Sequence, residues 1–202
     1  TIWSPRVAAL YELTSTKNLY VNVSKGFSTP TVDETLTPQG LINTTLKPEI
    51  GWNYEVGFKG NWFKNLYSEI ALYSIQVNDL LVAERVAEDQ YVGANAGKTD
   101  HNGIEVLLKY NWQLSPKISL QPYASTNFNF YKFDEFIDEG EDYSGNDLTG
   151  VPDQKINLGI DLLTESGFRF FSNALFVSEI PLNDTNSLYS DSYQLINLKA
   201  AY

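Results

Sequence analysis

Apolar and polar side chains alternate with a period of two along most of the chain, which is the pattern of a half-exposed β-strand. Between Trp52 and Trp62, the even positions are aromatic or aliphatic apart from Gly60, whereas the odd positions are Asn, Glu, Gly or Lys. The alternation predicts about nine strands. They are expected at Val7–Leu13, Leu19–Phe27, Trp52–Trp62, Leu66–Val77, Ile104–Trp112, Ile118–Phe130, Ile156–Leu162, Phe168–Val177 and Ile196–Tyr202.

The connections between these segments alternate between short and long. Short polar turns are expected at Thr14–Lys17, Phe63–Asn65, Gln113–Pro116 and Thr164–Gly167. Long irregular connections are expected at Ser28–Ile50, Val82–Asn102, Asp134–Val151 and Glu179–Asp191. In a sheet of antiparallel neighbours, this alternation places every tight turn at one end and every long loop at the other, as in an outer-membrane barrel.

Strand length favours the same interpretation. Trp52 and Trp62 are ten residues apart on one face, which corresponds to about 33 Å of strand. A tilt of about 40° reduces this length to about 25 Å of height, the thickness of the apolar band of such barrels. Aromatic residues are expected to form two girdles at its borders. One comprises Tyr11, Tyr20, Trp62, Phe63, Tyr67, Tyr110, Trp112, Phe168 and Phe170, and the other Phe27, Trp52, Tyr54, Phe130, Tyr131, Phe133 and Phe176.

Composition narrows the possible functions. The net charge is −11, without a cluster of Lys and Arg, which argues against nucleic-acid binding. The chain has no Cys and one His, so it offers no disulfide, no thiolate metal site and few enzyme templates. Its apolar runs are shorter than a transmembrane helix needs. We therefore expect no catalytic residue, no metal ligand and no cofactor, and we expect Thr1 to be the cut end of a longer protein.

Three segments resemble the barrel of TonB-dependent outer-membrane receptors of the ferric siderophore type. The first is the hairpin of Ser4–Tyr11 and Asn18–Thr31. The second is Leu46–Gly60, in which Lys-Pro-Glu is followed by a Tyr-Glu-Val-Gly strand. The third consists of Asn-Ala-Gly-Lys at residues 95–98, followed by Gly-Ile-Glu at residues 103–105. Together they cover about the first half of the chain in the family's order, and the second half matches by pattern.

This resemblance implies a 22-stranded barrel around a plug domain, which imports an iron–siderophore complex or a similar nutrient with energy supplied by TonB. Residues 1–202 would form a C-terminal part of that barrel, an all-β, antiparallel transmembrane segment without its plug. The implied partners are the nutrient, outer-membrane lipid, and TonB through an absent N-terminal region. The implied location is the bacterial outer membrane.

No motif identifies the residues that contact the ligand. Tyr91, Asp138 and Tyr143 are candidates only because they lie in the expected outer loops. The acidic stretch Asp134–Asp147 is interpreted as a solvated loop rather than a cation site, with divalent bridging to lipopolysaccharide as a further hypothesis. His101 is interpreted as a loop residue.

A row of polar residues is expected to face the barrel lumen. It is interpreted as a solvated wall against the plug rather than a substrate site. The row comprises Asn53, Glu55, Lys59, Glu105, Lys109, Asn127, Asn129, Lys155, Asn157 and Asp161.

Two other functions remain open. A passive porin-like barrel would show the same alternation but gives no reason for the Lys-Pro-Glu and Asn-Ala-Gly-Lys motifs. A soluble carbohydrate-binding β-sandwich would bury the row of Trp52, Val56 and Phe58 under a second sheet. The position of that row therefore decides between a membrane protein and a sandwich.

Overall fold

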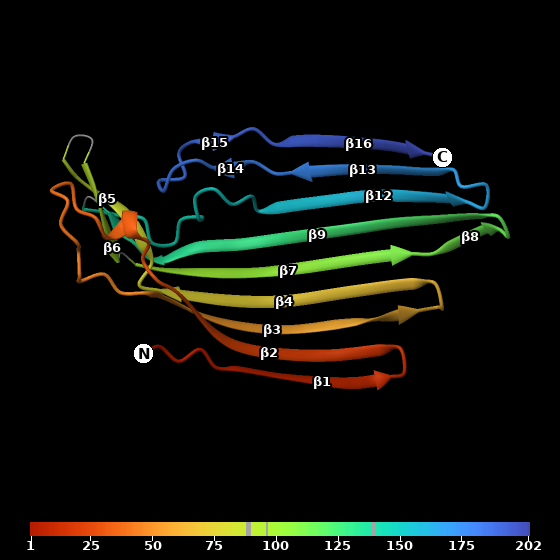
Figure 1. The fold of residues 1–202 in the computed structure, drawn as a ribbon, viewed down its shortest axis with the longest axis horizontal. Coiled ribbons are helices and arrows are strands. Elements are labelled where there is room, and N and C mark those ends of the chain that lie inside the picture. Colours follow the sequence, from red (N-terminus) through yellow and green to blue (C-terminus); the bar gives the residue numbers. More distant parts are fainter. Residues whose placement is uncertain (88–89, 96, 139) are drawn as a thin grey trace.

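The computed structural model describes residues 1–87, 90–95, 97–138 and 140–202, with the side chains of 83–87 and 91 outside that description. Nine strands form one antiparallel sheet in the order β1-β2-β3-β4-β7-β9-β12-β13-β16 (Figure 1). Their bounds are β1 Arg6–Thr14, β2 Lys17–Ser28, β3 Glu49–Trp62, β4 Leu66–Asn78, β7 Lys98–Tyr110, β9 Ile118–Glu135, β12 Gln154–Thr164, β13 Arg169–Val177 and β16 Tyr193–Ala201. The short β8 (Trp112–Ser115) pairs with β9 beside this path. The predicted all-β fold and its nine strands are confirmed.

Tight turns and long loops lie at opposite ends of the sheet, as the sequence predicts (Figure 1). The loop end also carries three two-stranded hairpins and a one-turn helix, α1 (Val32–Thr35). The hairpins pair β5 (Leu81–Ala87) with β6 (Gln90–Asn95), β10 (Ile137–Asp138) with β11 (Glu141–Asp142), and β14 (Ile180–Pro181) with β15 (Tyr189–Ser190). In the described part of the chain, no helix is long and apolar enough to cross a membrane.

Two strands extend further toward the loops than the alternation predicts. β7 begins at Lys98 rather than Ile104, and β9 ends at Glu135 rather than Phe130. The expectation of an irregular connection over Val82–Asn102 was therefore wrong. Alternation is lost there because Asp100 and Asn102 occupy positions that are apolar further along β7, whereas the backbone pairing continues through both residues.

The pairing register assigns each side chain to a face, because residues directly opposite each other on neighbouring strands share one. Val56 pairs with Val21 on one side and with Leu72 on the other. The row of Trp52, Tyr54, Val56, Phe58 and Trp62 thus lies on one face, the apolar face. All ten residues of the predicted lumen-facing row lie on the other, the polar face.

No second layer covers the apolar face in the residues that the structure describes. Tyr54 and Val56 at its centre remain 44% and 40% exposed. A soluble sandwich would bury these side chains. The sandwich interpretation is therefore wrong, and the apolar face is exposed.

Part of the girdle prediction was wrong. Tyr20, Tyr67, Tyr131 and Phe133 lie on the polar face, whereas the girdles require the apolar face. The distance of a residue from a turn indicates how far along the strand it lies. Its face is given only by whether it alternates with the apolar or with the polar residues of its strand, and these four aromatic residues alternate with the apolar ones.

Three tyrosines on the polar face each lie over a glycine of the next strand. Tyr20 is opposite Gly57, and a Cβ on that glycine would lie 2.2 Å from the tyrosine ring. Tyr73 with Gly103, and Tyr123 with Gly159, repeat the arrangement. Each ring covers backbone that a glycine would otherwise leave bare, an aromatic rescue of a weak strand position.

We predict that Gly57→Ala destabilises the barrel, because the added methyl group would displace the Tyr20 ring. Overpacking of this kind costs about 1–3 kcal/mol. The measurement is the thermal unfolding midpoint of the complete protein in detergent. Gly26→Ala is the matched control, because nothing lies within 4 Å of the position of its Cβ. Equal midpoints for the two variants would show that the Tyr20 ring moves aside at no cost.

Candidate functional site

Aromatic rings and amides from three strands meet on the polar face just below the loops. The ring of His101 in β7 stacks on Tyr131 of β9, with centroids 4.5 Å apart. The hydroxyl groups of Tyr131 and of Tyr73, in β4, are 2.8 Å apart. Tyr73 also donates to Asn129 Oδ1 at 3.3 Å. We call Tyr73, His101, Asn129 and Tyr131 the polar-face cluster.

The cluster is held from both sides. The Nδ2 of Asn129 donates to the carbonyl of Pro152 at 2.8 Å, in the loop that precedes β12. The Nε2 of His101 is 2.9 Å from the hydroxyl of Thr99, which is 1% exposed. The rings are therefore fixed in position, as a binding surface requires to limit the entropy lost on binding.

A small hydrophobic core lies beside this cluster at the foot of a loop. Phe133 and Phe136 are each 4% exposed, and their rings stack with centroids 4.5 Å apart. Tyr143 packs on Phe136 at 5.8 Å, and its backbone N–H donates to the Phe136 carbonyl at 2.9 Å. The core anchors the β10–β11 hairpin to the end of β9.

Two of the three candidate ligand residues lie on or next to this hairpin. Asp138 is half-buried in β10, and Tyr143 follows β11. Tyr91 belongs to β6, and its side chain is outside the described part of the structure. None of the three is in the polar-face cluster. Sequence reasoning missed the cluster because it assigned Tyr131 to a girdle and His101 to a loop, although both share the odd parity of Glu105.

Further down the polar face lie three carboxylates, Glu55, Glu69 and Glu105. Glu55 accepts a hydrogen bond of 2.6 Å from the hydroxyl of Tyr20, and the hydroxyl of Tyr67 donates to Glu69. None of the three belongs to an ion pair among the described residues. Lys59 lies directly opposite Glu69 on the same face.

The two motifs that carry the family resemblance meet in space. Asn95 accepts from the backbone N–H of Lys47 at 2.7 Å, and its Nδ2 donates to the Lys47 carbonyl at 2.9 Å. The Nδ2 also donates to the Asp79 carbonyl at 2.8 Å. Glu49, in the first motif, accepts from the backbone N–H of Leu81 at 2.8 Å. The motifs thus fasten the β2–β3 loop to the β5–β6 hairpin.

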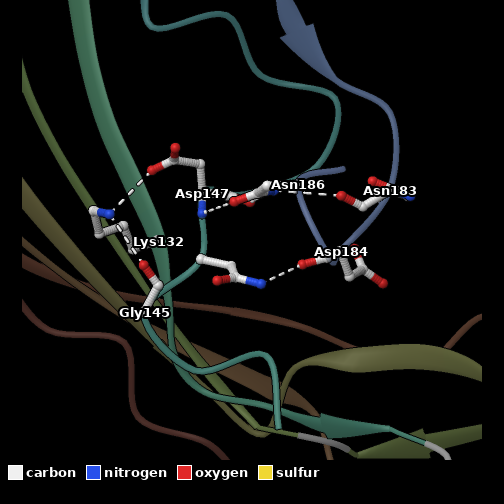
Figure 2. Close-up of polar contacts among 7 residues, drawn as sticks. Lys132, Gly145, Asp147, Asn183, Asp184 and Asn186 are labelled. Atoms are coloured by element: carbon white, nitrogen blue, oxygen red, sulfur yellow. Dashed lines mark hydrogen bonds and ion pairs between the residues drawn. The ribbon is translucent and has the colours of Figure 1, made fainter. Parts of the chain in front are cut away.

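A second pair of long loops is joined in the same manner (Figure 2). The backbone N–H of Asp147 donates to Asn186 Oδ1 at 2.6 Å, and Asn186 Nδ2 returns a bond of 2.9 Å to the Asp147 carbonyl. Asn186 therefore pairs with the backbone as a neighbouring strand would. Beside it, the Nδ2 of Asn146 donates to the Asp184 carbonyl at 2.7 Å.

The β9 strand holds this junction from below. Lys132 Nζ lies 3.1 Å from Asp147 Oδ1 and donates to the Gly145 carbonyl at 3.0 Å (Figure 2). The hydroxyl of Thr149 donates to Asp184 Oδ1 at 2.5 Å. The β9–β12 loop (residues 136–153) and the β13–β16 loop (residues 178–192) therefore form one connected unit above the polar face.

The acidic stretch does not assemble a cation site. In the ranges that the structure describes, no group of three His, Cys, Asp or Glu side chains is placed to hold a metal ion. Glu135 instead forms an ion pair with Lys98 at 2.5 Å, and Asp147 pairs with Lys132. Hydrogen bonds from Ser144 hold the pKa of the Asp142 carboxyl below its usual value.

The pKa of Asp153, just before β12, is shifted in the opposite direction. Burial, reinforced by the negative charge of Asp147, raises the pKa of its carboxyl. Glu179 adds to this shift, whereas Lys132 opposes it. The foot of the joined loops therefore disfavours additional negative charge.

Comparison with known proteins supplies the context for this site. A family model described as "TonB dependent receptor-like, beta-barrel" matches residues 1–202. The ferric-pyoverdine M114 receptor PbuA of Pseudomonas sp. (strain M114) is 31% identical over 107 residues, which are 50% of this chain and 12% of that receptor.

Solved structures show the same fold. The ferric citrate transporter FecA is 23% identical with a TM-score of 0.74, over 98% of this chain and 30% of that one. BauA, the ferric preacinetobactin receptor from Acinetobacter baumannii, is 17% identical with a TM-score of 0.72, over 98% of this chain and 29% of that one. The chain thus spans less than a third of the length of these relatives.

We predict that Asn186→Ala loosens both joined loops, because it removes the two bonds to the Asp147 backbone. At about 1 kcal/mol for each bond, backbone amides in both loops should exchange hydrogen roughly tenfold faster or more. Hydrogen-exchange mass spectrometry measures this. Asn183→Ala is the control, because Asn183 Oδ1 accepts from Ser187 and Leu188 within its own loop. Faster exchange confined to the β13–β16 loop in the Asn186 variant would contradict the coupling.

Proposed function

Because the chain belongs to the TonB-dependent receptor β-barrel family of the bacterial outer membrane, we propose that it forms part of the wall of a receptor that imports a ferric siderophore. The joined loops would admit the chelate, and the polar-face cluster would contact it. TonB would supply the energy through a region outside these 202 residues. In this proposal the protein acts as a transport receptor and not as an enzyme.

The polar-face cluster carries the proposal. Siderophores are large organic chelators, and fixed aromatic rings offer contact area at a low entropic cost. Tyr73, His101 and Tyr131 present such rings beside hydrogen-bonding amides. The 31% sequence identity to a ferric-pyoverdine receptor over 107 residues supports a ferric siderophore as the ligand. Tyr91, Asp138 and Tyr143 remain proposed contacts from the loops above.

The carboxylates lower on the polar face support a second part of the proposal, a plug inside the barrel. Glu55, Glu69 and Glu105 lie on the polar face and form no ion pair among the described residues. A charge facing a water-filled lumen is solvated at little cost, but it also binds an Arg or Lys of a segment placed there. A passive porin-like barrel has no such segment, and the family match favours the receptor.

The test is binding of ferric pyoverdine and ferric citrate to the complete purified receptor, followed by quenching of intrinsic tryptophan fluorescence. We expect a saturable signal with at least one chelate. A receptor that binds neither chelate would contradict a siderophore function. Growth on the bound chelate as sole iron source, abolished by deletion of TonB, would distinguish active import from passive diffusion.

We predict that Tyr131→Ala weakens chelate binding by about tenfold, the usual cost of removing an aromatic anchor at a binding surface. Tyr123→Ala is the matched control. It is another β9 tyrosine of the polar face, eight residues nearer the turns. Tyr131→Phe keeps the stacked ring and loses the hydroxyl contact, so its loss should be smaller. An equal loss for Tyr131→Ala and Tyr123→Ala would remove the cluster from the binding site.

A further inference from the structure

One lysine lies on the apolar face at the short-turn end of the sheet. Lys17 is the first residue of β2, and its side chain crosses the bare backbone of Gly60 in β3. A Cβ on Gly60 would lie 2.9 Å from Lys17 Cγ. The Lys17 Nζ lies 3.7 Å from the centre of the Trp62 ring. The absence of a side chain at Gly60 thus allows the lysine stem to lie flat and the ammonium to reach the indole.

The indole itself is fixed. Trp62 Nε1 donates to the hydroxyl of Ser68 at 2.9 Å, and the ring packs against Phe58 with centroids 5.5 Å apart. A tryptophan in this position marks the border of the hydrocarbon layer. The Lys17 ammonium is therefore held at that border, which is where lysines near a membrane place their charge.

Among the described residues, the Lys17 ammonium forms no ion pair with a carboxylate. The nearby Glu12 is opposite Asn18 and lies on the polar face, on the other side of the sheet. A charge that is half removed from water gains from an anion supplied by its surroundings. Lys25 lies over Trp52 in a looser contact of 5.8 Å at the loop end of the same face, so Lys17 forms the closer of these two contacts.

We propose that Lys17 and Trp62 bind the phosphate of an anionic phospholipid in the periplasmic leaflet. Short turns of outer-membrane barrels face the periplasm, so this end of the sheet meets phospholipid rather than lipopolysaccharide. The acyl chains lie along the exposed apolar side chains of Leu19 and Val21, which continue the same row of β2. The proposal depends on the outer-membrane location and is independent of the imported chelate.

The test is native mass spectrometry of the complete receptor, mixed in detergent with phosphatidylglycerol or with phosphatidylcholine of the same acyl chains. We expect a preference for phosphatidylglycerol that Lys17→Gln reduces about fivefold, the effect of one basic residue at an anionic surface. Lys17→Arg should retain the preference. Lys117→Gln is the matched control, because Lys117 lies in a turn at the same end and pairs with Glu165 at 3.3 Å.

Three results would overturn the proposal. They are an unchanged preference in Lys17→Gln, an equal loss in Lys117→Gln, and complete displacement of the lipid by glycerol phosphate, which would indicate a site for free phosphate. Chelate binding should be the same in all three variants. A receptor that binds no siderophore would still report its lipid preference, so failure of the proposed function and failure of this site are distinguishable.

Discussion

The pairing of backbone groups between neighbouring strands is the constraint from which the remaining structure follows. In hydrocarbon, an unpaired N–H or C=O group has no water to bind, so the ladder must be continuous across the membrane. An uninterrupted register in turn assigns alternate side chains to opposite faces. This is why Val56 and Glu55, adjacent in the chain, lie on the apolar and the polar face respectively. If the register of a strand shifted by one residue, the side chains of that strand would exchange their two faces.

At the loop end, side chains instead of neighbouring strands provide hydrogen-bond partners for the backbone. Asn95 and Asn186 each pair a primary amide with both the N–H and the C=O of one residue in another loop. An asparagine amide has the same donor and acceptor groups as a peptide unit. Loops that are too irregular for a ladder are thereby joined at single points.

The sequence predicted the sheet well because alternation and turn spacing are local properties. The nine strands, the two kinds of connection and the lumen-facing row, Glu55 and Glu105 included, follow from them. The polar-face cluster did not follow, because His101 and Tyr131 meet only when the register of β7 on β9 is known. The girdle assignments of Tyr20 and Phe133 failed for a different reason, because they followed distance from a turn and not parity along the strand. Aromatic side chains lie on both faces of this sheet, so the residue type alone does not show on which face an aromatic residue lies.

The junction between Asp147 and Asn186 has a consequence for immune recognition of the cell surface. Two separate stretches of sequence are joined there by a pair of residues that lie 39 positions apart in the chain. A linear peptide copied from either stretch would lack the surface that the other supplies. An antiserum raised against such a peptide would therefore bind the denatured protein far better than intact bacteria, and a useful immunogen must display both segments together.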